Sequence, residues 1–108
     1  MEYIKPGDVH SPKNHWTLIA VLYEGKEQEC ALAIGRWSDK WVKNKIYLAM
    51  RWNGHSENSI GSPQSRGLPT WMMIDEKYNE ALLNSGTLSP DKLALARNFI
   101  PQPVPSTE

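Results

Sequence analysis

Four side chains suited to acid–base and phosphate chemistry lie in one polar stretch of the sequence, residues 51–71: Arg51, His55, Glu57 and Arg66. Cleavage of RNA by transphosphorylation needs a base, an acid and a cation on the phosphate. A carboxylate, an imidazole and a guanidinium supply these three groups. One loop can bring them together because it carries all of them. Since soluble loops are commonly rich in the same residue types, the pattern allows either a catalytic site or an ordinary polar loop.

The stretch also has the composition of an anion-binding loop. Gly61 and Gly67 provide permissive dihedrals and main-chain N–H donors, and Ser65 provides a hydroxyl. The bidentate fork of Arg66 fits a carboxylate or a phosphate. No lysine–hydroxyl pair and no helix start follow the glycines, so this is not a Walker loop. We favour a loop whose polar groups satisfy its own main chain, because a loop this long must pair those groups.

Arg66 has two possible roles, which are recognition of a ligand and stabilisation of the loop. It lies between Pro63 and Pro69, which reduce the conformational freedom of the unfolded loop. Its guanidinium can recognise a ligand, or it can tie the loop down through carbonyls of residues 53–61 or through Glu57. We expect the tie, because arginine has five donors and a long loop needs them.

Tryptophan is unusually frequent, with residues at positions 16, 37, 41, 52 and 71. We expect the tryptophans at positions 16, 52 and 71 to build the core, since an indole brings a large apolar surface. Trp37 and Trp41 flank a polar turn, where an indole can stack on bases or sugars or pack over the edge of the core. The candidate binding residues of the chain are Arg51, Asn53, Gln64, Ser65, Arg66 and Trp41.

Metal ligands and cofactor motifs are not recognisable in the sequence. His10, His15 and His55 are scattered, and a structural zinc site needs closely spaced pairs. Cys30 is the single cysteine, so no internal disulfide forms, and we expect it to be a small core residue. We therefore predict neither a metal nor a cofactor.

The charge balance bears on the class of partner. The 108 residues contain twelve Lys or Arg and twelve Asp or Glu, so no basic excess favours nucleic acid, although a local basic patch could still form. The longest apolar run is far shorter than the ~20 residues of a membrane helix. The first residues contain no apolar signal segment. We expect a cytoplasmic protein without a membrane partner.

Hydrophobic patterning predicts the elements that must position these side chains. Strands are expected at residues 15–24, 29–37, 46–52 and 70–74, with helices starting after Asp75 and at Ser89-Pro90. Small residues on one face of the second strand would let another part of the chain, such as a helix, pack close against it. The predicted fold is α+β, an antiparallel β-meander of about four strands with one or two C-terminal helices. Residues 1–100 form the single domain, and residues 101–108 form a flexible proline-rich tail.

Four blocks of sequence carry a resemblance to other proteins. They are RWNG at 51–54, IG at 60–61, PQSRGLPTW at 63–71 and the opening PGDVHSP at 6–12. In these blocks the chain resembles a group of small bacterial proteins. The resemblance covers most of the chain and implies a bacterial, stand-alone protein. It carries no activity across, and residues 41–45 look like an insertion.

We expect a small cytoplasmic binding module that uses the 53–69 loop to contact another macromolecule, with a protein favoured over nucleic acid. One alternative is a small hydrolase or ribonuclease that uses His55, Glu57 and Arg66. A second alternative is a homo-oligomer in which the loop is a structural contact between subunits.

Overall fold

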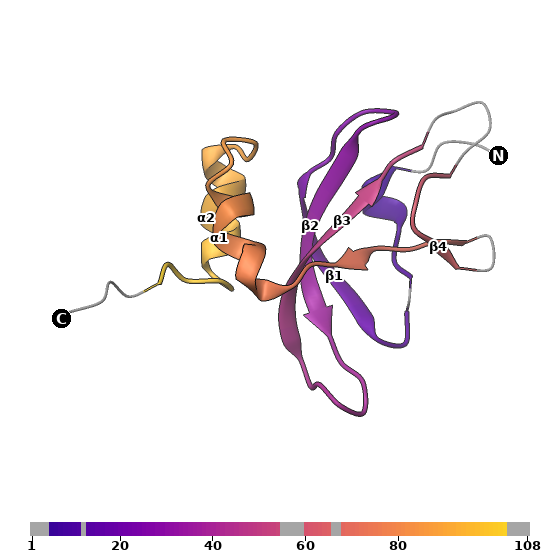
Figure 1. The fold of residues 1–108 in the computed structure, drawn as a ribbon, viewed down its shortest axis with the longest axis horizontal. Helices are drawn as coiled ribbons and strands as arrows, with labels where there is room; N and C mark the ends of the chain where they lie inside the picture. Colours follow the sequence, from indigo (N-terminus) through magenta and orange to yellow (C-terminus); the bar gives the residue numbers. More distant parts are fainter. Residues whose placement is uncertain (1–4, 12, 55–59, 66–67, 104–108) are drawn as a thin grey trace.

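A four-stranded antiparallel sheet organises the chain. The computed structural model describes residues 5–11, 13–54, 60–65 and 68–103 (Figure 1). The strand order is β1-β2-β3-β6, and each neighbouring pair is antiparallel. The strands are β1 (Trp16–Tyr23), β2 (Cys30–Trp37), β3 (Lys45–Trp52) and β6 (Met72–Met73), and a separate ribbon pairs β4 (Gln64–Ser65) with β5 (Leu68–Pro69). This sheet and its C-terminal helices confirm the predicted α+β fold.

One short helix precedes the sheet and three follow it, and the sequence predicted the capping residues Asp75 and Ser89. The helices are η1 (Pro6–Asp8), η2 (Glu76–Tyr78), α1 (Asn79–Leu83) and α2 (Pro90–Arg97). The Asp75 carboxylate accepts from the main-chain N–H of Lys77, and the Ser89 hydroxyl accepts from that of Lys92. Each cap satisfies an N–H group that the first helical turn leaves without a partner. Among the described residues, no helix is both long and apolar enough to cross a membrane.

One face of the sheet is covered by the helices, which lie to one side of it in Figure 1. Leu32 and Ile34 of β2 and Leu48 of β3 pack there against Leu83 of α1 and Ala96 of α2. All five side chains are at least 95% buried. This face matches the apolar alternation that the sequence predicted for β2 and β3.

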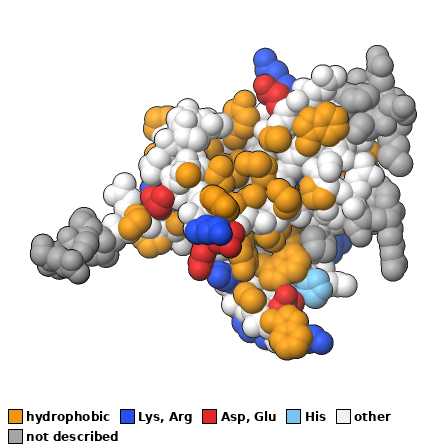
Figure 2. All heavy atoms as spheres, in the orientation of Figure 1, with side chains coloured by type: hydrophobic (Ala, Val, Ile, Leu, Met, Phe, Trp, Pro, Cys, Tyr) orange, Lys and Arg blue, Asp and Glu red, His pale blue; other side chains and the backbone are white. Residues whose placement is uncertain are grey.

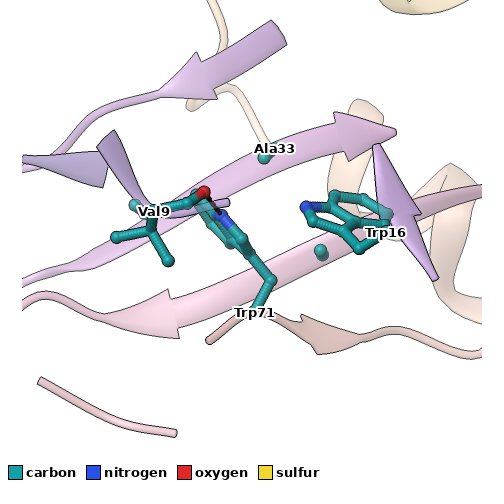
Figure 3. Packing of buried hydrophobic residues seen from close by; sticks show 6 residues of the cluster. Val9, Trp16, Ala33 and Trp71 are labelled. Carbon is teal, nitrogen blue, oxygen red and sulfur yellow. Dashed lines mark hydrogen bonds between the residues drawn. The ribbon is translucent and has the colours of Figure 1, made fainter. Parts of the chain in front are cut away.

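The opposite face is built from small residues covered by tryptophans. Ala33 lies in one cluster with Val9, Trp16 and Trp71, and the Trp71 indole N–H donates to the carbonyl of Val9 at 2.7 Å (Figure 3). The close packing expected over the small face of β2 is therefore made by tryptophan rings and not by a helix. Alanine and glycine leave room for an indole, and the N-terminal arm supplies the acceptor that its N–H requires.

Two expectations about the core are wrong. Trp52 keeps 36% of its surface exposed, and Cys30 is exposed as well. The two residues are register partners at the last position of β3 and the first of β2. Their period-2 pattern is that of core residues, but they lie at the end of the sheet, where less protein packs over them.

The close contact between β1 and β2 generates a stability prediction at Gly35. A Cβ built there would collide with the Trp16 ring and lie 2.5 Å from the Thr17 carbonyl oxygen. Gly35→Ala is therefore expected to lower the free energy of unfolding by about 1–3 kcal/mol, the usual cost of overpacking. Urea denaturation measures this, with Gly7→Ala as the control, because nothing lies within 4 Å of that added Cβ. Equal free energies of unfolding for the two variants would contradict the close packing of Trp16 on Gly35.

Candidate functional site

The described part of the 53–69 loop is held by a buried arginine at the end of β3. Arg51 is 1% exposed. Its guanidinium donates to the carbonyls of Ile60 and Thr70, the latter at 2.6 Å, and lies 3.5 Å from that of Pro63. One cation therefore joins the strand to the middle of the loop and to the residue that follows it. A buried charge is stable only with such partners, so the loop and the arginine depend on each other.

Asn53 fixes the point at which the loop leaves β3. The side chain is fully buried, and its amide donates to the carbonyls of Glu24 at 2.9 Å and Lys26 at 3.0 Å. The Asn53 main-chain N–H donates to the carbonyl of Glu29 at 2.9 Å. The start of the loop is thereby tied to the turn between β1 and β2.

The next described segment of the loop returns along the end of β3. Trp52 and Ser62 exchange two main-chain hydrogen bonds of 2.7 and 2.8 Å. The Gln64 amide donates to the Gly61 carbonyl at 2.7 Å. Gly61 has a φ of +88°, and a Cβ at this residue would collide with the Trp52 carbonyl and the Arg51 guanidinium. The described loop is therefore closely packed on the strand.

These contacts give most of the described candidate residues a structural role. The side chains of Arg51 and Asn53 donate hydrogen bonds to main-chain carbonyls, and the amide of Gln64 donates to a carbonyl within the loop. Ser65 lies in β4. A tie of the kind expected from Arg66 is made by Arg51, and the alternation of β3 places Arg51 on the same face as Ala49. The candidates His55, Glu57 and Arg66 lie outside the described residues.

The turn between β2 and β3 presents the remaining candidate, Trp41. Asp39 orders this turn: Oδ1 accepts from the main-chain N–H groups of Trp41 and Val42, both at 2.7 Å, and Oδ2 accepts from the Trp37 indole at 2.8 Å. Three donors favour the ionised carboxylate, so the Trp37 indole first, and then the two main-chain groups, lower the pKa of Asp39. Trp41 is 80% exposed on this ordered turn.

A hollow of about 450 Å³ lies beside the turn. Figure 2 shows hydrophobic, acidic and basic side chains gathered at the lower edge of the molecule, where the β2–β3 hairpin lies in Figure 1. Within the hollow, the Lys45 ammonium lies 3.4 Å from a Glu76 carboxylate oxygen and 5.2 Å from the centre of the Tyr47 ring. The hydrogen bond to Glu76 raises the pKa of Lys45. The lining residues are Trp37, Asp39, Val42, Lys45, Tyr47, Met73, Ile74, Asp75 and Glu76.

Sequence reasoning missed this hollow because its two sides are distant in the chain. Asp39 follows Trp37 by two residues and precedes Trp41 by two, which is typical of a carboxylate that caps a turn, and this local signal was available. The approach of Glu76 to Lys45 depends on the pairing of β6 with β3 and has no local signal.

The described residues contain no group of three or more His, Cys, Asp or Glu side chains placed to hold a metal ion. Comparison with known proteins gives no matching family, no similar curated protein and no similar solved structure.

The buried guanidinium generates a second prediction. Arg51→Met keeps an unbranched apolar stem but leaves the Ile60 and Thr70 carbonyls without their donor. Each buried carbonyl left unpaired costs ~1–3 kcal/mol, so we expect a loss of about 3 kcal/mol in the free energy of unfolding. Urea denaturation measures it. The control Arg36→Met, at an exposed arginine 5.6 Å from the Phe99 ring, should lose at most about 1 kcal/mol.

The turn generates a prediction about pH. The folded-state pKa of Asp39 lies below the model-peptide value of 3.8, so ionised Asp39 stabilises the fold above that pH. This contribution is lost as the pH falls through the folded-state pKa. A ¹³C NMR titration of the Asp39 carboxyl should give a pKa below 3.8, and Trp37→Phe should raise it, because the indole donor is the largest cause. An unchanged pKa in Trp37→Phe would contradict the assignment.

Proposed function

We propose that this protein is a small binding module that contacts another protein. The observation that carries the proposal is Trp41, an indole 80% exposed on an ordered turn. Tryptophan is enriched among residues whose truncation costs ~2 kcal/mol or more of binding free energy, because its ring fills a partner's pocket. An exposed indole is a candidate for such a contact.

The surroundings of Trp41 support this role. The Asp39 carboxylate holds the turn in one conformation, which lowers the conformational entropy that binding would cost. The Lys40 ammonium lies 4.8 Å from the centre of the Trp41 ring. Charged groups at the edge of an aromatic contact favour specificity and rapid association.

The 53–69 loop is the second contact surface that we propose. The ties from Arg51 and Asn53 support it, because they hold the described part of the loop against the end of β3. Lys45 and Trp52, the two ends of β3, are about 23 Å apart at ~3.3 Å per residue. A macromolecule is large enough to touch both ends, and the balanced charge of the chain favours a protein over nucleic acid. A cytoplasmic, bacterial setting belongs to the same proposal.

A capture experiment with matched variants tests the function. Trp41→Ala is expected to abolish capture of a partner from a bacterial lysate and to change stability by no more than about 0.5 kcal/mol. The control Lys92→Ala truncates a long exposed side chain on α2, outside both proposed contact surfaces, and should keep the partner. The partner, identified by mass spectrometry, is then titrated in pure form against each variant.

Two outcomes would contradict the proposal. Trp41→Ala could bind the pure partner as tightly as the wild type does. Alternatively, the wild type could cleave labelled RNA with an activity that disappears in His55→Ala, which would favour the hydrolase or ribonuclease hypothesis.

A further inference from the structure

We propose that the hollow between the β2–β3 hairpin and the start of η2 binds a lysine or arginine side chain carried by an extended, basic segment of the partner. This inference rests on the proposed function and adds the chemistry of the contact. Its support comes from four features: the balance of charge in the hollow, its aromatic side chains, the open edge of β3 beside it and its volume.

The charge of the hollow favours a cation. Three carboxylates line it, those of Asp39, Asp75 and Glu76, against the single ammonium of Lys45. Asp39 keeps its charge at neutral pH, because three donors stabilise the ionised form. The net charge of the lining is therefore about two negative units, which repels phosphate and attracts an ammonium or a guanidinium.

The chain itself already shows how a cation is held here. The Lys45 ammonium lies between a carboxylate, 3.4 Å away on Glu76, and the face of an aromatic ring, that of Tyr47. The same two kinds of group occur again at Trp37 and Asp39, where the indole donates to the carboxylate at 2.8 Å. The Asp39 carboxylate at the edge of the Trp37 indole therefore offers a cation from a partner a second negative group in the same hollow.

The edge of β3 beside the hollow suits an extended segment. The register partners of β6 on β3 are Ala49 and Met50, and the N–H of Ile74 donates to the Leu48 carbonyl. No strand among the described residues pairs with Lys45–Tyr47 on the side away from β2. Main-chain groups of alternate residues point to the same side of a strand, so those of Ile46 share the direction of those of Leu48. A segment of the partner can therefore add to this edge as a strand.

The volume of the hollow fits the same occupant. About 450 Å³ lies within the ~300–1,000 Å³ range of ligand sites and exceeds the volume of one lysine side chain. Apolar side chains of Val42, Met73 and Ile74 complete the lining and can pack against the methylene stem of the incoming residue. The hollow therefore has room for a cationic side chain and part of the main chain that carries it.

A peptide titration with the full chain tests the inference. The probe is a fluorescein-labelled decapeptide of alternating lysine and threonine, compared with peptides that have glutamine or glutamate in place of lysine. We expect fluorescence anisotropy to show binding of the lysine peptide at least tenfold tighter than that of the glutamine peptide, and no binding of the glutamate peptide. NMR shifts on addition of the lysine peptide should concentrate at residues 37–47 and 73–76.

Paired variants separate the hollow from the overall charge of the protein. Asp75→Asn with Glu76→Gln should weaken binding of the lysine peptide at least tenfold. Asp91→Asn with Glu27→Gln removes the same charge at exposed positions outside the lining and should stay within twofold of the wild type. Lys45→Met should tighten binding several-fold, because it removes the competing ammonium, whereas Lys92→Met should not.

Equal weakening by the two double variants would overturn the inference, as would equal affinity for the lysine and glutamine peptides or no binding of the lysine peptide at millimolar concentration. If the lysine peptide does not bind while capture of a partner still depends on Trp41, this inference is wrong and the proposed function stands. If the peptide binds as expected but no partner depends on Trp41, the proposed function fails instead.

Discussion

The buried guanidinium of Arg51 is the contact on which the end of the sheet depends. It donates to the carbonyls of Ile60 and Thr70, so one side chain of β3 holds two described points of the polar stretch 51–71. Burying this charge would be very unfavourable if those carbonyls were absent, and the carbonyls would be unpaired without the charge. The described part of the loop and the end of β3 therefore depend on each other.

The other face of the sheet depends on small residues. Ala31, Ala33 and Gly35 leave space above β2, and indoles from β1 and from the segment before β6 fill it. The Trp71 N–H reaches the N-terminal arm, so the arm is fixed by the same ring that fills the space (Figure 3). Two layers thus cover the sheet, one helical and one made of single large side chains.

The turn between β2 and β3 links the two proposed modes of binding. Asp39 orders the main chain that presents Trp41, and its carboxylate also lines the hollow proposed for a cation. A charge placed there by a partner would lie close to the group that fixes the indole. The exposed ring and the charged hollow are therefore parts of one surface, at the end of the sheet opposite the 53–69 loop.

Local pattern alone determined much of this protein. Period-2 alternation gave the faces of β2 and β3, and the hydrogen-bonding preferences of Asp75 and Ser89 gave the helix starts, because these signals act over a few residues. Only the tertiary structure decided that Arg51 is a buried tie, that tryptophans cover the small face, and that Lys45 meets Glu76. Each of these depends on which strands become neighbours, and β3 and β6 are separated in the chain by the nineteen residues 53–71. The exposure of Trp41 was equally open in the sequence, since a turn can fold over a core or away from it.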